Sequence, residues 1–199
     1  MKAKPTLTDV AKVLTGRCPR RLVEERERKA QGSGSGTGYV GHLGRPHHGE
    51  VDRLAELYRS RGYWTGTRLH AGLLETPLPV VAELDLVVAD GRRAAVVEVK
   101  TGELRPEHLF GVLLGAVAWA RLEGRVGLHR EVSAVLWHPG LGFPLYLRTP
   151  DPRIPLARAG AALGDLLAAR PRVGPECAVC PLAREGGCPE GRAYLGGGS

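Results

Sequence analysis

Two carboxylates and a lysine gather in one stretch of the chain, ELDLVVADGRRAAVVEVK, which runs from residue 83 to residue 100. Asp85 lies near its start, and Glu98 and Lys100 stand two residues apart at its end. Because side chains alternate across a β-strand, Glu98 and Lys100 are expected on one face. Carboxylate oxygens are ligands that Mg²⁺ and Mn²⁺ prefer, and an adjacent ammonium can orient water or neutralise charge on a phosphate. The same spacing also fits a Glu–Lys pair that holds no metal.

The residues around this triad predict a β-hairpin. Two β-rich runs flank Asp90-Gly91, a dipeptide that favours hairpin turns, within residues 78–101. Pairing of the two strands would bring Asp85 to Glu98, and the backbone carbonyl of Val99 could complete the inner ligand shell of a divalent ion. Such an ion would activate water for attack on a phosphodiester. Glu83 is expected on the face of Asp85, behind the ligands.

Three of the four cysteines form a second constellation. Cys177, Cys180 and Cys188 lie within twelve residues of one another, and the two-residue gap between the first pair suits two thiolates on one metal centre. Cys18, about 160 residues earlier, is the remaining thiol. Its ligation would tie the N-terminal helix to the C-terminal tail. An iron–sulfur cluster, a four-thiolate zinc site, disulfides and unrelated free thiols are the competing interpretations.

The composition describes an ordinary globular chain. It has 199 residues, 43% of them hydrophobic and 25% charged, which excludes wholesale disorder and favours one domain. No apolar run is long enough for a membrane span, and the N-terminus lacks a secretory pattern, so we expect a cytoplasmic protein with no membrane partner.

The net charge of +7 results from 23 Arg and 5 Lys against 21 Asp and Glu. This positive charge indicates a polyanionic partner. A GC-rich genome, which prefers Arg to Lys, would explain the excess of arginine equally well.

Periodicity predicts an α/β or α+β domain. Helices are expected over residues 8–28 with an interruption near 16–19, and over 48–61, 106–123 and 156–170. Strands are expected over the two halves of 78–101, over 132–137 and over 144–149. Within a single domain spanning 1–199, residues 1–30 are expected to form an N-terminal helical segment, 31–38 a flexible Gly/Ser loop, 39–172 the core and 173–191 the Cys-rich tail.

These motifs together resemble the CRISPR-associated RecB-like exonucleases, members of the PD-(D/E)xK superfamily that carry a four-cysteine iron–sulfur cluster. The resemblance covers almost the whole chain, with the motifs in the family's order. The matching segments are Cys18-Pro19-Arg20-Arg21, Gly44-Arg45-Pro46-His47-His48, Ala82-Glu83-Leu84-Asp85, Glu98-Val99-Lys100 and the three C-terminal cysteines. One motif departs: the family places a glutamine on the helix after the E-x-K strand, where this chain has Gly111 or Gly115.

The resemblance implies the fold, the cofactors and the ligands. The fold would be an α/β (α+β) PD-(D/E)xK core of the restriction-endonuclease kind, with a central mixed sheet flanked by helices. Cys18, Cys177, Cys180 and Cys188 would bind a [4Fe–4S] cluster that clasps the two ends of the chain. Asp85, Glu98 and the Val99 carbonyl, with His48 from the preceding helix, would hold Mn²⁺ or Mg²⁺, and Lys100 would complete the catalytic set. His47 is the alternative to His48, since the two are adjacent.

DNA contacts are expected from basic and aromatic residues near these motifs. Arginines neutralise phosphates without regard to sequence, and aromatic rings stack on unpaired bases. The candidates are Arg20, Arg21, Arg45, Arg93 and Tyr39. Tyr63 and Trp64 are further candidates for stacking, with packing in the core as the alternative.

The function expected from the resemblance is metal-dependent exonuclease digestion of single-stranded DNA ends or overhangs. It would process spacer precursors in CRISPR adaptation beside the CRISPR integrase and its small partner subunit. A RecB-like repair nuclease outside CRISPR and a catalytically weak DNA-binding module with a cluster are the alternatives. The missing glutamine favours the last, and the retention of Asp85, Glu98 and Lys100 favours a nuclease.

Overall fold

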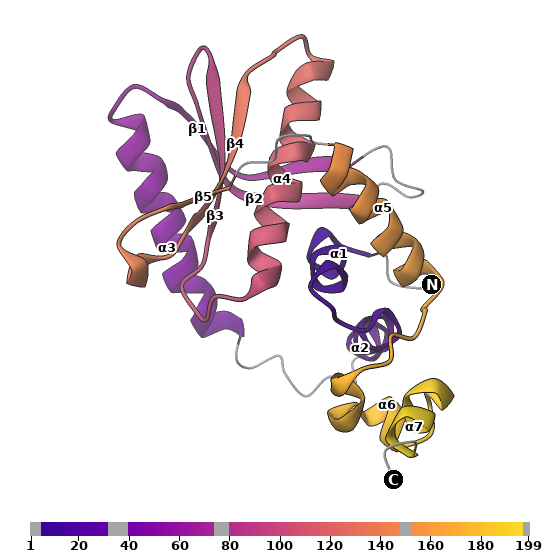
Figure 1. Ribbon diagram of the computed structural model, residues 1–199. Coiled ribbons are helices and arrows are strands. Elements are labelled where there is room, and N and C mark those ends of the chain that lie inside the picture. The colour runs from indigo at the N-terminus through magenta and orange to yellow at the C-terminus, as the bar shows by residue number, and fades with distance from the viewer. Residues whose placement is uncertain (1–4, 32–39, 74–79, 148–152, 197–199) are drawn as a thin grey trace.

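The computed structural model describes residues 5–31, 40–73, 80–147 and 153–196, with the backbone alone for residues 40–45, 73 and 154. It confirms the expected α/β fold, in which helices pack on a five-stranded mixed sheet of order β1-β2-β3-β4-β5 (Figure 1). The strands are β1 (Trp64–Leu73), β2 (Val80–Ala89), β3 (Arg93–Val99), β4 (Glu131–Trp137) and β5 (Leu145–Leu147). The helices are α1 (Leu7–Leu14), α2 (Pro19–Ala30), α3 (Val40–Arg59), α4 (Pro106–Arg125), α5 (Arg153–Leu167), α6 (Pro181–Arg184) and α7 (Pro189–Gly196), with short 3₁₀ turns at Pro139–Leu141 and Pro175–Val179.

The expected hairpin forms the centre of the sheet. β2 and β3 are antiparallel, and Asp90 fixes the turn between them because its Oδ1 accepts hydrogen bonds from the backbone N–H groups of Arg92 and Arg93, each 2.7 Å long. β4 then lies parallel to β3, so the chain must cross over between them, and α4 makes that crossover. The sheet is therefore mixed, as the sequence predicted.

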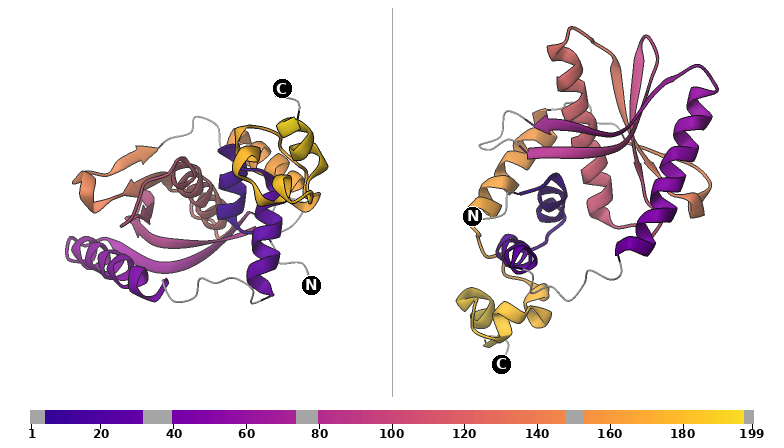
Figure 2. Two further views of the ribbon diagram at one scale, coloured as in Figure 1. Left: turned by 90° about the horizontal axis from the view of Figure 1, so that it is seen from below. Right: turned by 180° about the vertical axis from the view of Figure 1, so that it is seen from behind.

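Helices cover both faces of the sheet. α4, α1 and α5 pack on one face, and α3 packs alone on the other (Figure 2). The larger core lies under α4 and includes Leu84, Val96 and Leu136, whereas the smaller core lies under α3 and includes Leu54, Val97 and Val135. Burial of these side chains on both faces explains the near-continuous apolar runs of the two central strands.

Strands β2 and β3 separate at Asp85, beyond the last paired residues Leu86 and Val97, and we call this opening the fork. Leu84 faces the larger core, but Leu86 faces the smaller one, so the regular alternation of β2 is broken at the residue between them. On the neighbouring strand Arg68 has a positive φ of 53° at the same level, between the pairs Thr67↔Leu86 and Leu69↔Leu84. Pairing of β2 with β3 starts only at Leu86↔Val97. The side chain of Asp85 therefore points into the opening rather than into a ladder.

The two ends of the chain lie together beside the sheet domain (Figures 1 and 2). α1 packs against α4 and α5, whereas α2 packs against α5 and lies next to the tail formed by α6 and α7. The cap of α1 is Thr6: its hydroxyl accepts the Asp9 N–H while the Asp9 carboxylate accepts the Thr6 N–H. This reciprocal capping box fixes where the helix starts.

Two elements differ from the sequence predictions. α3 begins at Val40, eight residues before the expected start, and Pro46 lies inside it. β1 was not expected at all, yet it pairs with β2 over nearly its whole length. The expected loop at residues 31–38 lies outside the described residues, apart from Gln31 at the end of α2. Across the described ranges, no helix is both long and apolar enough to cross a membrane.

Candidate functional site

Asp85 is the residue at which three parts of the fold meet. From β2, its Oδ2 accepts the backbone N–H of Val99 on β3 at 2.9 Å, which ties the fork together. Its Oδ1 lies 3.2 Å from Nε2 of His47 on α3. The carboxylate therefore links both strands of the hairpin to the one helix that covers this face of the sheet.

Glu98 and Lys100 share one face at the end of β3, as predicted, and their side chains form an ion pair. Burial is the main cause that raises the pKa of Glu98, and the negative charge of Asp85 raises it further. The Lys100 ammonium and the His47 imidazole act in the opposite direction. A divalent cation would stabilise these two partly buried carboxylates. Its charge would offset both their mutual repulsion and the cost of removing them from water.

A cavity of about 290 Å³ opens beside Asp85. Its lining residues come from α3, β1 and β2, and they are His47, His48, Val51, Arg68, Glu83 and Asp85. Glu83 thus shares the face of Asp85, as expected. Arg68 was not singled out from the sequence, and its position follows from the irregular backbone that breaks β1 opposite Asp85.

The two adjacent histidines have different positions. The ring of His47 contacts Asp85 and is partly buried, whereas His48 is exposed at the cavity and meets His47 edge to face at 5.3 Å between ring centroids. The residue in contact with the carboxylate is therefore the neighbour of the one that the motif spacing favoured. A helix turns 100° per residue, so a shift of one position changes which side chain faces the sheet.

The fit of a divalent cation rests on donor chemistry. No three His, Cys, Asp or Glu side chains within the described part of the chain come close enough to hold one metal ion, so the expected set of His48, Asp85 and Glu98 is not assembled. Mg²⁺ and Mn²⁺ need no such cage, since they commonly take one or two carboxylates together with waters and substrate phosphates. The carboxylates of Asp85 and Glu98, which lie near enough to repel each other, fit that requirement. The backbone carbonyl of Val99, the last residue of β3, is a further oxygen donor next to them.

Two further side chains support the Lys100 end of β3, and sequence reasoning missed both. The Lys100 N–H donates to the carbonyl of Trp137 on β4, and the Trp137 indole donates to Glu50 Oε1 on α3 at 2.7 Å. Hydrogen bonds from Arg53 are the main cause that lowers the pKa of Glu50. A tryptophan at a strand end and a glutamate on a helix carry no motif, so only the fold shows that they brace the site.

His108 lies near Lys100 at the start of α4. Burial, followed by the positive charge of Lys100, lowers the pKa of this imidazole, and its Nδ1 accepts the Arg105 N–H at 3.2 Å. It is the polar side chain that this helix presents toward the site. At the places considered for the family's glutamine, Gly115 has little room, since an added Cβ would lie 3.0 Å from Leu84 Cδ2, whereas Gly111 lies in open space.

The four cysteines surround one pocket between α2 and the tail, although they come from both ends of the chain. The pocket contains Gly191, where an added Cβ would lie 3.3 Å from Cys188 Sγ and 3.5 Å from Cys177 Sγ. N–H groups also point at the sulfurs: Arg172 N donates to Cys18 at 3.3 Å and Gly191 N to Cys188 at 3.4 Å. Within the described residues, no three of these sulfurs lie close enough together to bind a single ion. The expected metal link between the two ends of the chain is therefore seen only as a pocket that all four cysteines line.

The donor set and the cradle fit a group larger than one ion. Four thiols, backbone N–H groups directed at sulfur and a glycine that leaves space between two of them are features that an iron–sulfur cluster uses. A single zinc with Zn–S bonds of about 2.3 Å would need the four sulfurs drawn tightly together. The four interpretations that the sequence leaves open therefore remain open, and the shared pocket is what the structure adds to them.

Most of the arginines expected on DNA are held in ion pairs within the chain. Arg20 pairs with Glu190 at 2.9 Å and Arg21 with Glu25 at 2.8 Å, whereas Arg93 lies 3.6 Å from Glu131. The side chain of Arg45 and all of Tyr39 fall outside the described part of the structure. Arg20 and Arg21 thus have structural partners beside the cysteine pocket, which the sequence did not indicate.

The two remaining aromatic candidates are more exposed than core packing predicts. Tyr63 is 39% exposed and Trp64 is 52% exposed. Each makes one ring contact, Tyr63 with Tyr58 and Trp64 with the buried Trp119. Both therefore retain a free face.

Comparison with known proteins yields a structural relative and no family. No family model and no curated protein matches the sequence. The crystal structure of SSO0001 matches the fold with a TM-score of 0.63 at 17% sequence identity, over 96% of this chain and 88% of that chain. The likeness shows a shared fold. It extends over nearly the whole chain, so the helical ends and the sheet belong to one architecture.

Proposed function

We propose that this protein is a metal-dependent deoxyribonuclease of the PD-(D/E)xK type that acts on single-stranded DNA ends or overhangs. The observation that carries the proposal is that Asp85 is hydrogen-bonded to the end of β3, where Glu98 and Lys100 form an ion pair. Asp85 also lines a cavity of about 290 Å³ together with His47 and His48. The raised pKa of Glu98, caused by burial and by the Asp85 charge, is typical of carboxylates that share a cation.

The residues present fit the roles that hydrolysis requires. A divalent cation held by Asp85 and Glu98 would lower the pKa of a bound water and offset negative charge on the phosphate. Lys100, held against Glu98, would orient the attacking water and donate to the phosphoryl oxygen as charge develops. The water oxygen forms a new bond to phosphorus, the phosphodiester P–O bond breaks, and the leaving oxygen takes up a proton.

His47 is the third group of the proposed site. Its imidazole contacts the Asp85 carboxylate, so it would either bind the same cation or position the carboxylate that does. The motif spacing pointed to His48, but the contact with Asp85 favours His47. The cysteine pocket supplies the second cofactor of the proposal, a [4Fe–4S] cluster that would hold the two ends of the chain in place.

The biological setting of the proposal rests on the sequence motifs. A nuclease with a C-P-R-R segment, an E-x-K strand and three C-terminal cysteines would trim spacer precursors in CRISPR adaptation, with the CRISPR integrase and its small partner subunit as partners. A RecB-like nuclease in DNA repair would use the same site, and gene neighbourhood distinguishes the two settings.

A catalytically weak DNA-binding module is the second candidate. The observation that favours it is Gly115, where close packing on Leu84 leaves little room for the glutamine that the related nucleases carry. Degradation of DNA by stoichiometric protein with Mn²⁺ would exclude this candidate.

The first test is degradation of end-labelled single-stranded DNA in Mn²⁺. Lys100→Ala should lower the rate at least a hundredfold, since a positioned proton donor contributes about 10²–10⁴ in rate. Lys29→Ala, at an exposed lysine near the end of α2, is the matched control and should cleave at the wild-type rate. Equal rates for wild type and Lys100→Ala, with the fold intact by circular dichroism, would refute the proposed site.

A further inference from the structure

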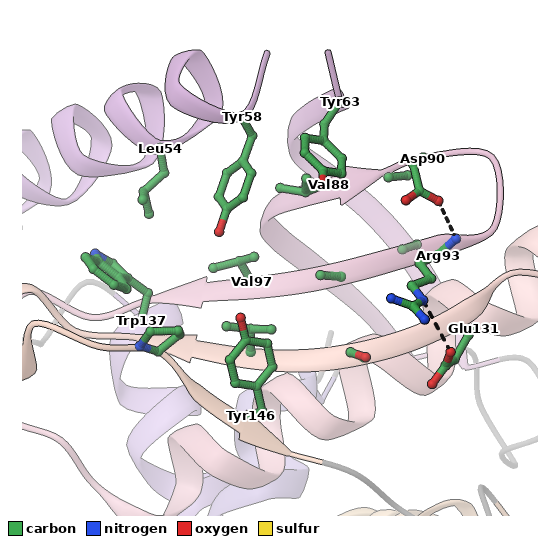
Figure 3. Close-up of a pocket in the computed structure, with 16 residues that line it drawn as sticks. Leu54, Tyr58, Tyr63, Val88, Asp90, Arg93, Val97, Glu131, Trp137 and Tyr146 are labelled. Atoms are coloured by element: carbon green, nitrogen blue, oxygen red, sulfur yellow. Dashed lines mark hydrogen bonds and ion pairs between the residues drawn. The ribbon is translucent and has the colours of Figure 1, made fainter. Parts of the chain in front are cut away.

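A second and larger cavity lies on the α3 face of the sheet, beside the C-terminal half of that helix (Figure 3). Its volume is about 360 Å³, which is within the range of ligand pockets. β3 and β4 supply an apolar floor that includes Val97 and Val135. Four aromatic side chains line it, namely Tyr58, Tyr63, Trp137 and Tyr146. A flat apolar floor between aromatic rings suits a planar ring.

Away from its charged end, this pocket presents neutral polar groups, among them the hydroxyls of Tyr58 and Tyr146. Tyr58 and Tyr146 face each other across it, with both hydroxyls directed into the space between them (Figure 3). No hydrogen bond joins either hydroxyl to another described residue. A phenol both donates and accepts, and the half-buried Tyr58 hydroxyl favours a ligand that supplies a hydrogen-bond partner, whereas Tyr146 is exposed and its hydroxyl remains accessible to such a ligand. The ligand is therefore expected to carry ring nitrogens or carbonyl oxygens at its edge.

The charges at the far end of the pocket select against an anion. Asp90 and Glu131 lie there with Arg93, whose Nε is 3.6 Å from Glu131 Oε2. The two carboxylates at this end disfavour a phosphate group placed directly against them. Carboxylate oxygens accept hydrogen bonds from amino groups, such as those on adenine, cytosine and guanine. The lining thus fits a nucleobase and not the phosphate of a nucleotide.

From these features we propose that the pocket receives one unpaired nucleobase of the DNA strand. The base would stack against the aromatic walls and present its edge to the tyrosine hydroxyls, as proteins that bind single strands do. This inference rests on the proposed function, because the strand that enters the pocket is the one that is cut. Its phosphates would remain outside, on the side of the pocket away from Asp90 and Glu131.

Trp137 connects this pocket to the candidate active site. Its ring lines the pocket, its indole N–H donates to Glu50, and its carbonyl accepts the N–H of Lys100. From Ala95 in the pocket to Lys100, β3 advances five residues, or about 16 Å at about 3.3 Å per residue. A strand rises about 3.4 Å per stacked nucleotide and more when unstacked. The captured base therefore lies about two to five nucleotides from the bond that is cut.

The test uses single-stranded oligonucleotides that carry 2-aminopurine at successive positions from each end. They are bound to the full-length Lys100→Ala protein, which leaves the strand uncut. Stacking on an aromatic ring should quench the emission most strongly at one position, two to five nucleotides from a terminus. Quenching that is the same at every position would overturn the inference.

Matched tyrosine variants in the Lys100→Ala background locate the effect. Tyr146→Ala should weaken binding at least about fivefold and abolish the position-specific quenching, as expected for loss of a base–aromatic stack. Tyr146 is 68% exposed, so its removal should leave the fold intact. Tyr194→Ala, at a 46% exposed tyrosine on α7, is the control and should bind as the parent does. Equal affinities for the Tyr146 and Tyr194 variants would refute the pocket.

The two proposals fail separately. If wild-type protein does not degrade DNA, the nuclease proposal fails, whereas the quenching series still decides whether a base enters the pocket. If wild-type protein cleaves normally and the Tyr146→Ala variant keeps full affinity and quenching, the pocket inference alone is wrong.

Discussion

Single side chains determine what the fork in the sheet can do. Asp85 accepts one backbone hydrogen bond, from Val99 on β3, through Oδ2, and its Oδ1 contacts the His47 imidazole of α3. Each of its two oxygens therefore has a partner within the protein. Glu98 forms an ion pair with Lys100. A cation that enters would have to compete with these contacts, and the repulsion between the two carboxylates gives it the driving force to do so.

The adjacent histidines allow a direct comparison at the level of one residue. His47→Ala should weaken Mn²⁺ affinity about 10–100-fold, because it removes the imidazole that contacts Asp85. His48→Ala, one position along, should change it less than threefold, because that side chain is exposed and contacts no carboxylate in the described structure. Isothermal titration with Mn²⁺ measures both. The reverse order of effects would show that the motif spacing, which favours His48, identifies the ligand correctly.

At the scale of elements, the short helix α7 shapes the cysteine pocket. Gly191 lies on it where an added Cβ would be 2.9 Å from Ala183 Cβ on α6 and would crowd two sulfurs. The absence of a side chain at this position is therefore what lets α7 approach α6 and leaves space among the thiols.

Gly191→Ala is expected to lower the iron content of anaerobically purified protein by at least half and to lower its melting temperature. The added methyl group occupies the space between Cys177 and Cys188, and the packing of α6 on α7 must shift. Gly164→Ala on α5 is the matched control, because an added Cβ there meets nothing and alanine favours a helix. Iron assay and thermal unfolding measure the effect, and equal iron content in both variants would contradict the role given to Gly191.

Sequence patterns predicted the central elements better than those at the margin. The hairpin of β2 and β3 was clear because two β-branched runs flank a turn dipeptide, and α4 was clear because its apolar residues recur at helical spacing. β1 was missed because Gly66 and Gly72 interrupt it and Arg68 has a left-handed backbone, so no apolar alternation survives. The start of α3 was missed because Pro46 normally marks a helix boundary.

The site was predictable only as far as the motifs extend. Asp85, Glu98 and Lys100 follow from strand pairing and alternation, which are local rules. Trp137 and Glu50 brace the same place, but they are 87 residues apart and carry no spacing signal. Contacts of this kind arise from the crossover through α4 and the packing of α3, which the sequence alone does not reveal.

Across the whole molecule, polar contacts join the N-terminal segment to the tail. Arg20 reaches both Cys188 and Glu190, Arg17 pairs with Glu176 at 3.3 Å, and the Arg172 backbone donates to Cys18. These pairs are partly exposed, so each contributes little to stability. Together with the shared cysteine pocket, they explain why a basic N-terminus need not be a DNA-binding surface.

Binding of one divalent cation by Asp85 and Glu98 is the central claim at this scale, because the pairing of β2 with β3 brings the two carboxylates near each other and α3 places His47 against Asp85. Titration of Mn²⁺ followed by its electron paramagnetic resonance signal, with the cysteine pocket loaded as purified, tests this most directly. Wild-type protein should bind one Mn²⁺. Asp85→Asn should lose at least tenfold in affinity, because it removes one of the two repelling charges and a ligand oxygen. Asp90→Asn, at the hairpin turn on the same strand pair, should bind as wild type does. Equal Mn²⁺ affinity in all three proteins would contradict the account.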